Sequence, residues 1–313
     1  MRNTIHFLYV PFVGLGLYKG FRGDYWLKNR IKIFKHFVIP ALMNQTKLEF
    51  IVWISWTEQM RTNPIVQRFM EHLDMLQGMR FVHTFGGICF YDDKYPPEIA
   101  KKRLMESLKT SLPELKSWIP NDTDYVLMTI QPSDDLYLSH VVKEVHDIDY
   151  KEGQVLGYKQ GYIMKYDTLE MAEYNPTTIP PFFTIVFKPG VFLNPEAHFK
   201  YTGPYESHEY VKDFLEFIEL KGRGFVVGIH GENISTGFNH PFKGIELTTE
   251  EAEKILIQTG LYLAEPLILE KDLKRKVMKK LLNILPRFIQ YQIIRFLSPG
   301  ITEKVKSYKW FNI

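Results

Sequence analysis

The sequence contains almost no cysteine and no long apolar run. Its 313 residues include a single cysteine, Cys89, which excludes a disulfide within the chain and a cysteine-based zinc cluster. The longest N-terminal apolar run, Ile5–Leu17, is interrupted by Pro11 and two glycines. It is too short to span a bilayer, which takes roughly eighteen apolar residues or more, and no small-residue cleavage site follows it. We therefore expect a cytoplasmic protein without a transmembrane helix.

Two nucleotide-binding signatures are also missing. The glycine-rich stretch GLGLYKGFRGDYW, residues 14–26, has no Gly-Lys-Ser/Thr and is therefore not a P-loop. The dinucleotide-binding fingerprint is absent as well. Lys19, Arg22 and Arg30 nevertheless follow the first predicted strand closely enough to contact a diphosphate. A solvated basic loop is the alternative explanation of these charges.

The chain has little net charge, but that charge is unevenly distributed. Lys and Arg number 39 against 36 Asp and Glu, a formal balance of +3. Residues 270–313 alone carry eleven Lys or Arg and three Asp or Glu, a balance of +8. The rest of the chain therefore carries −5, the difference between +3 and +8. An acidic body with one basic tail argues against a nucleic-acid partner.

The basic tail has the periodicity of an amphipathic helix. Apolar residues recur at helical spacing at Leu273, Val277, Leu281, Leu285 and Phe288. Pro286 should kink or split this helix. Such a helix over 270–298 either lies at a membrane surface and attracts anionic lipid, or packs on the protein's own core. The sequence leaves both possibilities open.

The first half of the chain alternates between predicted strands and predicted helices. Strands are predicted at 4–13, 50–55, 80–85 and 124–130. Helices are predicted from Asp24, the expected N-cap, to about 38, at 63–77, and from Pro96 to about 111. This alternation is typical of a parallel sheet with helices on its faces, in which ligands bind beyond the carboxyl ends of the strands.

The pattern changes beyond residue 150. Paired strands and turns are predicted at 154–166 and 181–193, a helix at 206–220 and a strand at 224–230. We found no internal repeat and no low-complexity segment.

Two adjacent carboxylates, Asp134 and Asp135, follow the buried strand predicted at 124–130. At about 4 Å, two such charges repel by about 4 kcal/mol when the effective dielectric constant is near 20. A bound divalent cation reverses the sign of this interaction, and oxygen ligands favour Mg²⁺ or Mn²⁺. The alternative is that one aspartate caps a helix predicted over 136–146. Capping would leave the other carboxylate without a role.

Two further clusters could carry chemistry. His230 ends a predicted strand and enters the turn HGEN, where a neutral imidazole either completes a metal site or bonds the nearby backbone. Glu206, His208 and Glu209 lie at the start of the predicted helix 206–220. Carboxylates in a first helical turn are favoured by the helix dipole, but one of these groups could also act as a general base.

Three stretches together resemble the rhamnosyltransferase family, a branch of the glycosyltransferases with the nucleotide-sugar-binding GT-A fold. They are DYWLKNRIKIFKHFVIPALMNQTKLEFIVWIS at 24–55, MTIQPSDDLYL at 128–138 and GFVVGIHGENIS at 224–235. The similarity extends over roughly residues 4–236. It implies a GT-A-like, Rossmann-like α/β fold, with a mixed, mostly parallel sheet flanked by helices and a C-terminal helical appendage.

The resemblance also implies a division of the chain. A glycosyltransferase catalytic domain would span 1–265, with a nucleotide-sugar half at about 1–150 and an acceptor half at about 151–265. A basic helical tail would occupy 266–313.

The resemblance implies a metal-dependent glycosyltransferase that uses Mn²⁺ or Mg²⁺. Its substrates would be a nucleoside diphosphate-sugar and a glycan or lipid-linked acceptor, in glycan or envelope polysaccharide synthesis. The implied metal ligands are Asp135, Asp134 and His230. The resemblance makes Arg30 and Asp134 donor contacts, and we predict Pro11, Arg22 and Asn233 beside them. The candidate catalytic bases are the clustered residues Glu206, Glu209 and His208.

The chain differs from the family at one motif. Where the family has Arg-Leu-Asp-x-Asp-Asp, this chain has Ile130-Gln131-Pro132-Ser133-Asp134-Asp135, so an arginine and one carboxylate are missing. The sugar nucleotide is therefore not identified by the resemblance. Two other hypotheses fit the same residues: a non-catalytic sugar-nucleotide or carbohydrate-binding protein on a degenerate transferase fold, and a metal-dependent phosphohydrolase.

Overall fold

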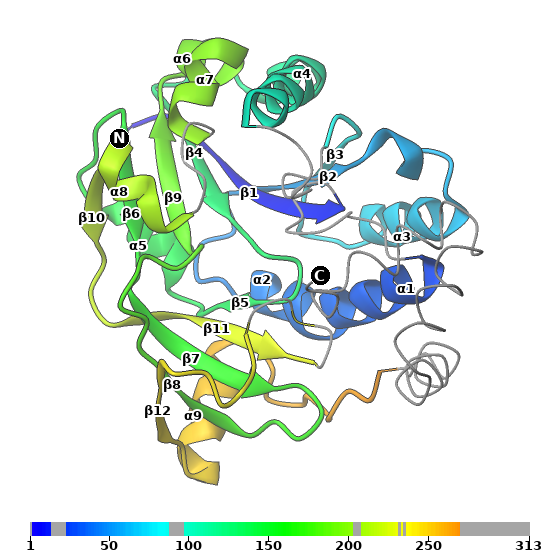
Figure 1. The fold of residues 1–313 in the computed structure, drawn as a ribbon, viewed down its shortest axis with the longest axis vertical. Helices are drawn as coiled ribbons and strands as arrows, with labels where there is room; N and C mark the ends of the chain where they lie inside the picture. Colours follow the sequence, from blue (N-terminus) through cyan, green and yellow to red (C-terminus); the bar gives the residue numbers. More distant parts are fainter. Residues whose placement is uncertain are drawn as a thin grey trace, which may run out of the picture. The chain divides into compact units, whose positions relative to one another are not determined.

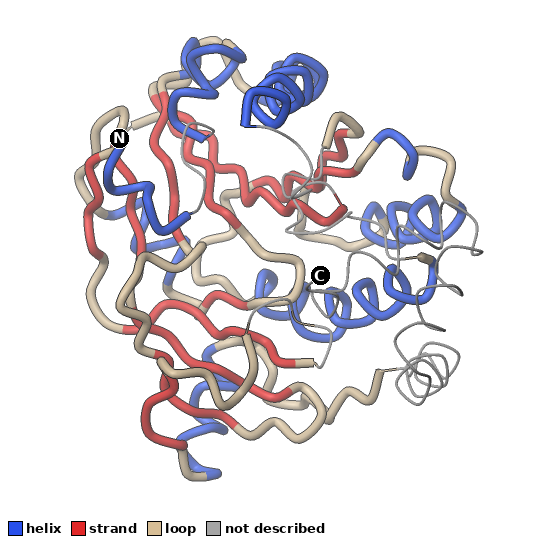
Figure 2. The backbone as a smooth tube through the Cα atoms, in the orientation of Figure 1, coloured by secondary structure: helices blue, strands red, loops and turns tan. Residues whose placement is uncertain are grey.

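Two β-sheets organise the part of the chain that the computed structural model describes (Figures 1 and 2). The described residues are 2–13, 23–87, 97–202, 208–230, 233 and 236–269. The chain divides into one unit, Met1–Leu269, and a second, Glu270–Ile313, which lies outside the described residues. The predicted basic helix at 270–298 therefore remains a prediction.

The larger sheet has seven strands in the order β10-β6-β9-β4-β1-β2-β3. Its strands are β1 (Thr4–Val13), β2 (Ile51–Trp56), β3 (Phe81–Thr84), β4 (Tyr125–Ile130), β6 (Gln154–Gly157), β9 (Phe183–Phe187) and β10 (Glu216–Glu219). The four strands β3, β2, β1 and β4 are parallel, and β9 runs antiparallel to both of its neighbours. The four parallel strands therefore place their carboxyl ends at one edge of the sheet.

The smaller sheet has five strands in the order β12-β8-β7-β11-β5. Its strands are β5 (Leu136–Tyr137), β7 (Gln160–Lys165), β8 (Met171–Tyr174), β11 (Arg223–Ile229) and β12 (Lys243–Glu246). Since β4 belongs to the larger sheet and β5 to the smaller one, residues 131–135 form the crossing between the sheets. The Asp pair lies in this crossing.

Helices cover both faces of the larger sheet (Figure 1). The α-helices are α1 (Asp24–Ile33), α2 (Ile39–Met43), α3 (Pro64–Asp74), α4 (Pro97–Leu115), α5 (Val141–Asp147), α6 (Pro189–Leu193), α7 (Pro195–Thr202), α8 (Val211–Phe214) and α9 (Thr249–Gln258). Short 3₁₀ turns are η2 (Glu58–Met60), η3 (Lys116–Trp118) and η4 (His208–Tyr210). None of the helices in the described ranges is long and apolar enough to cross a membrane.

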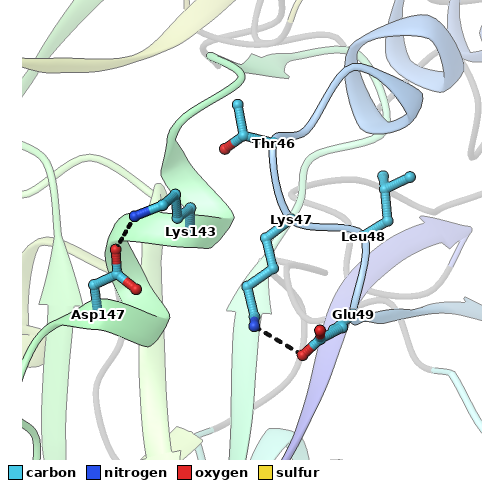
Figure 3. Close-up of a pocket in the computed structure, with 6 residues that line it drawn as sticks. All are labelled: Thr46, Lys47, Leu48, Glu49, Lys143 and Asp147. Carbon is cyan, nitrogen blue, oxygen red and sulfur yellow. Dashed lines mark hydrogen bonds and ion pairs between the residues drawn. The ribbon is translucent and has the colours of Figure 1, made fainter.

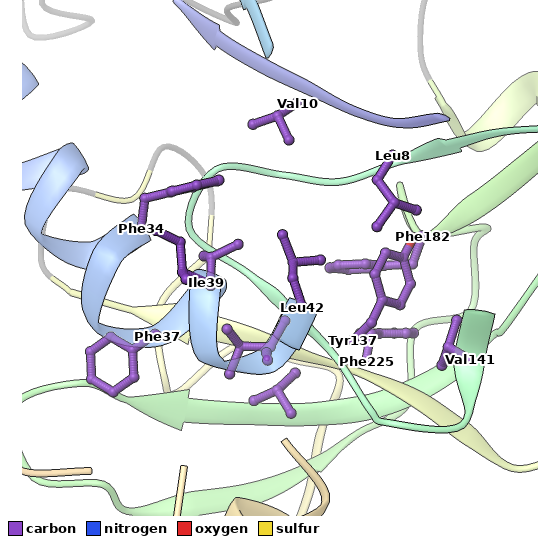
Figure 4. Close-up of a cluster of buried hydrophobic side chains, with 14 of the residues drawn as sticks. Leu8, Val10, Phe34, Phe37, Ile39, Leu42, Tyr137, Val141, Phe182 and Phe225 are labelled. Carbon is purple, nitrogen blue, oxygen red and sulfur yellow. The ribbon is translucent and has the colours of Figure 1, made fainter. Parts of the chain in front are cut away.

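Side chains of β1 alternate between two cores, as the period of a strand requires. Phe7 and Tyr9 pack on the α4 side with residues of α6, whereas Leu8 and Val10 face the other core. Figure 4 shows that second core, where Leu8 and Val10 lie above side chains of the α1–α2 segment and of the smaller sheet. This second core contains residues of both sheets, whereas the core on the α4 side contains none from the smaller sheet.

One π-helical turn, η1 (Phe34–Val38), connects α1 and α2. Pro40 has no N–H to donate, and the Ile39 N–H bonds back to the carbonyl of Phe34. Apolar residues at helical spacing in this segment are buried at Leu27, Phe34 and Val38, and Ile31 is partly buried.

The predicted α/β class, with a mixed and mostly parallel sheet flanked by helices, is confirmed. The helix predicted over 206–220 is wrong in its second half, because 216–219 pair with β6 as strand β10. The stretch 189–193 is the short helix α6 instead of a strand. Asp24 is the first residue of α1 and not its N-cap, which is Gly23.

The helix predicted over 136–146 is wrong in its first half and right in its second. Strand β5 follows the Asp pair directly, and α5 begins only at Val141, with His140 as its N-cap. Neither aspartate therefore caps a helix, and the capping explanation of the Asp pair is excluded.

Candidate functional site

The crossing at 131–135 is held by side chains that bond its own carbonyls. The Tyr137 hydroxyl donates to the Ile130 carbonyl at 2.7 Å. The amide of Gln131, a fully buried residue, donates to the Asp135 carbonyl at 2.8 Å and also to that of Pro132. Buried polar groups bonded in this way fix a backbone conformation.

A third tether reaches the crossing from Tyr166, the residue that follows β7. The Tyr166 hydroxyl donates to the Asp134 carbonyl at 2.8 Å. Its ring is stacked on Phe37 at 3.8 Å between centroids, and a looser stacked contact with His230 spans 6.3 Å. Tyr166 thus contacts the Asp134 backbone, the His230 ring and Phe37 of η1.

The Asp134 carboxylate has two nitrogen partners. The Arg30 guanidinium forms an ion pair with its Oδ2, and His230 Nε2 lies 2.9 Å from the same oxygen. Burial opposes ionisation of this carboxyl, but the charge of Arg30 and the hydrogen bond with His230 outweigh it and lower the pKa of Asp134 below its usual range. Asp134 is therefore held as an anion.

The Asp135 carboxyl has a different environment. Its Oδ1 accepts a hydrogen bond from the Gly228 N–H at 2.8 Å. No Lys or Arg within the described ranges forms an ion pair with it. Burial and then the neighbouring charge of Asp134 raise the pKa of Asp135 well above its usual range. When ionised, Asp135 is the carboxylate of this pair that has no Lys or Arg ion-pair partner among the described residues.

The chemistry of this pair fits a divalent cation, although the side chains do not form a complete metal site. In the described part of the chain, no three His, Cys, Asp or Glu side chains group together as metal ligands. Asp135 and Asp134 supply two adjacent carboxylates, and Mg²⁺ typically takes one or two carboxylates with waters and substrate phosphates. The unmatched charge of Asp135 would be offset by such an ion.

The turn after β11 is closed by Asn233. The His230 N–H donates to Asn233 Oδ1 at 2.8 Å, and Asn233 Nδ2 donates to the Gly228 carbonyl at 2.6 Å. Both ends of the amide are therefore used by the turn that places His230. Only 1% of the His230 side chain is exposed.

Arg30 reaches the Asp pair from α1. Its guanidinium lies over the Trp26 ring, 5.3 Å from the centroid, and one nitrogen lies 3.5 Å from the Ser133 hydroxyl. Only 7% of its side chain is exposed. Trp26 and Arg30 also line a small recess with His230. Arg30, Asp134 and His230, three residues singled out in the sequence, are therefore brought together.

Pro11 lies at the same edge of the larger sheet. It pairs with Ser55 at the end of β1, two residues beyond Tyr9, whose carbonyl accepts the Gln131 N–H at 2.8 Å. Arg22, the other predicted donor contact of the N-terminal loop, lies outside the described residues.

Two of the three predicted catalytic bases, His208 and Glu209, lie in η4, beside the loop that leads from β8 to β9. Glu209 accepts a hydrogen bond from the Thr178 hydroxyl at 3.1 Å. His208 Nδ1 lies 2.7 Å from the Ile179 carbonyl and donates to it, and burial lowers the pKa of His208. Glu206 lies outside the described residues.

The sequence did not point to Gln131, Tyr166 or Gly228 as residues of this site. Gly228 carried a usable signal, because an isolated glycine inside a strand pattern indicates a close approach of backbone. A Cβ at this position would lie 2.3 Å from the Tyr166 hydroxyl and 2.4 Å from the Asp134 carbonyl. We can identify no sequence signal that would have pointed to the tethers formed by Tyr166 and Gln131.

A second cleft, of about 520 Å³, lies away from the Asp pair (Figure 3). It is lined by Thr46, Lys47, Leu48, Glu49, Lys143 and Asp147. The first four precede β2, so the cleft is at the amino ends of the parallel strands. Lys47 pairs with Glu49 at 2.7 Å, and Lys143 pairs with Asp147 (Figure 3). Its lining charges are thus already matched.

No family model and no curated protein matches this chain. Among solved structures, it is similar to 4-diphosphocytidyl-2C-methyl-D-erythritol synthase from Anaerococcus prevotii, with 14% identity, a TM-score of 0.34, and 84% of this chain and 100% of that chain covered. It is also similar to mouse xyloside xylosyltransferase 1, with 9% identity, a TM-score of 0.32, and 69% and 85% covered.

A third similar structure is Staphylococcus aureus TarS, with 14% identity, a TM-score of 0.29, and 73% of this chain and 37% of that chain covered. With TM-scores this low, none of these similarities assigns an activity to this chain. Its membership of the rhamnosyltransferase family stays a prediction.

Proposed function

We propose that this chain is a metal-dependent glycosyltransferase with a GT-A-like fold. It moves a sugar from a nucleoside diphosphate-sugar to an acceptor hydroxyl. The observation that supports the proposal is the convergence of Asp134 and Asp135 from the end of β4 with His230 from the end of β11. Ligands of open α/β sheets bind at this edge.

Each residue has a role in this proposal. When bound by Asp135 with Asp134 and His230, Mn²⁺ or Mg²⁺ supplies the positive charge that stabilises a departing diphosphate. Arg30 adds a permanent positive charge beside the same carboxylate. The further proposed contacts with the nucleotide-sugar are Pro11, Arg22 and Asn233.

On the acceptor side, a carboxylate removes the proton of the attacking hydroxyl if the reaction inverts the anomeric centre. Glu209 and Glu206 are the first candidates for this base. His208 is the less favoured one, because its Nδ1 proton is already committed to the Ile179 carbonyl.

Thermal melting in the presence of nucleotides tests this function. UDP, GDP and dTDP, and the glucose, mannose and rhamnose donors built on them, are added with and without Mn²⁺. A ligand at a hundred times its Kd stabilises the folded state by about 2.7 kcal/mol. We expect one nucleotide family to raise the Tm of the wild-type protein in the presence of Mn²⁺. If none does, the proposed function is wrong.

The Asp135→Asn variant tests the metal role separately. The amide oxygen can still accept from Gly228, and the repulsion from Asp134 is removed, so the metal-free variant should melt at or above the wild-type temperature. It should lose both the Mn²⁺-dependent gain in Tm and the hydrolysis or transfer of the donor. Asp122→Asn, at an exposed loop position, is the matched control. Equal activity of Asp135→Asn and wild type would exclude the metal role.

The same measurements separate the two alternative functions. Sugar-nucleotide binding that persists in chelator, without turnover, would favour a non-catalytic binding protein. Release of phosphate from simple phosphate esters would favour a phosphohydrolase.

The proposal extends to where the protein acts. The basic segment 270–298 would hold a cytoplasmic enzyme at the inner face of a membrane, close to a lipid-linked or glycan acceptor of polysaccharide synthesis. Co-sedimentation of the full chain with vesicles checks this. Binding should require anionic lipid and decrease at high salt, and equal binding to neutral vesicles would contradict it.

A further inference from the structure

Four residues lie directly opposite one another across the smaller sheet. Tyr137 of β5 pairs with Phe225 of β11, Phe225 pairs with Gly161 of β7, and Gly161 pairs with Tyr174 of β8. Directly opposed residues project to the same face of a sheet. This face carries Tyr137, Phe225 and Tyr174, with Gly161 as a gap between two aromatic rings.

The gap at Gly161 is filled by its neighbour. A Cβ there would lie 2.4 Å from the Phe225 ring. Phe225 is stacked in turn on Phe182 from the loop before β9, at 4.0 Å between centroids. The aromatic face is therefore a fixed layer that leads from the crossing toward Tyr174.

Tyr174 lies at the end of this layer, and three aromatic rings pack around it. Its ring centroid lies 5.6 Å from that of His240, 6.3 Å from Phe242 and 6.4 Å from Phe225. The residue is 8% exposed, and its hydroxyl forms no hydrogen bond with the described residues. The hydroxyl is not among the buried polar atoms that lack a partner, so the oxygen itself contacts solvent and is open to a ligand.

The surroundings of this hydroxyl connect the two predicted halves of the site. Burial, followed by the charges of Asp135 and Glu209, raises the pKa of Tyr174 to about 12. Both carboxylates therefore lie within electrostatic reach of the same phenol. At neutral pH the phenol keeps its proton and can donate a hydrogen bond while its oxygen accepts another.

We propose that Tyr174 binds the acceptor sugar, with its hydroxyl bonded to an acceptor hydroxyl and the His240 and Phe242 rings beside the sugar. An aromatic surface with few polar groups is the usual composition of a small-ligand site. The ligand class is a pyranose with free hydroxyls. The acceptor role of this sugar rests on the proposed transferase function. The binding of a sugar at Tyr174 does not.

The test is glycoside binding by saturation-transfer NMR. The probes are the methyl glycosides of glucose, galactose, mannose and rhamnose, added to the wild-type protein and to the Tyr174→Phe variant. Phe keeps the buried ring and removes only the oxygen. Loss of one hydrogen bond should weaken binding about five- to tenfold. The control is Tyr150→Phe, whose hydroxyl lies 3.1 Å from Thr4 Oγ1, in a separate cluster with Tyr125.

We expect at least one glycoside to bind the wild-type and Tyr150→Phe proteins and to bind Tyr174→Phe more weakly. The inference is overturned if no glycoside binds the wild-type protein, or if Tyr174→Phe binds as well as the control. Melting with UDP, GDP and dTDP is measured on the same three proteins. Glycoside binding at Tyr174 without any nucleotide effect would reject the transferase function and keep the sugar site, whereas the reverse result would reject only the sugar site.

Discussion

At the scale of single residues, the site depends on an approach that only glycine permits. The Gly228 N–H bonds Asp135, while the Asp134 carbonyl and the Tyr166 hydroxyl occupy the space that a side chain would need. Glycine is therefore required here for room and not for an unusual φ angle, since its φ is not in the left-handed region. The same atoms that exclude a side chain are those that position the Asp pair.

Gly228→Ala should therefore damage the site more than the fold. The methyl group must displace Tyr166 or the crossing, and overpacking of this kind destabilises proteins by about 1–3 kcal/mol. We expect that loss in urea unfolding, together with loss of the Mn²⁺-dependent gain in Tm. Gly190→Ala is the matched control, because a Cβ there meets no atom within 4 Å. Wild-type metal dependence in Gly228→Ala would contradict this view of the site.

At the scale of secondary-structure elements, α9 begins with a reciprocal cap. Glu251 N donates to the Thr248 hydroxyl at 3.3 Å, and the Glu251 carboxylate accepts from Thr248 N at 2.8 Å. Thr248→Ala removes the first of these bonds, so it should lower the free energy of unfolding by about 1 kcal/mol. Thr249→Ala, one position further and exposed, should change it much less. Equal effects of the two substitutions in urea unfolding would exclude the cap as the cause.

The elements also show where sequence patterns suffice. Continuous apolar runs predicted β2 and β4, because strands buried on both faces need no other signal. The stretch EFIE was predicted to be helical, yet it forms β10 at the edge of the larger sheet. This stretch forms a strand because it pairs with β6, which lies about sixty residues earlier in the chain. Local patterns do not contain that pairing.

At the scale of the whole molecule, the site exists because two sheets meet at the crossing 131–135. The parallel-strand rule predicted the edge at which Asp134 and Asp135 lie. The second sheet was not predicted, and with it the tethers from Tyr166 and Gly228 were missed. His230 lies 96 residues after Asp134, and Arg30 belongs to α1, before β2 and β4. Their convergence on Asp134 therefore depends on long-range contacts, which spacing along the chain does not encode.

Buried histidines give the molecule a defined acid sensitivity. Burial is the first cause that lowers the pKa of His83, His146 and His198 to about 4, and it lowers that of His6 well below the usual value. The unfolded chain takes up these protons near pH 6.5, whereas the folded chain does not. The contribution of these neutral histidines to the free energy of unfolding is therefore complete above about pH 6.5 and is lost as the pH falls toward 4.

Each of these histidines should contribute a slope of up to about 1.4 kcal/mol per pH unit to the free energy of unfolding in this window. Urea unfolding at half-unit steps from pH 7.5 to 4.5 measures the slope. His146→Gln should reduce it by the share of one histidine, since it removes one group that the unfolded state protonates. Replacement of His146 also removes its contact with His6 Nδ1, 3.1 Å away, so the absolute stability falls at every pH while the slope becomes shallower. A free energy of unfolding that stays constant between pH 6.5 and 5 would show that the folded chain accommodates the protonated histidines.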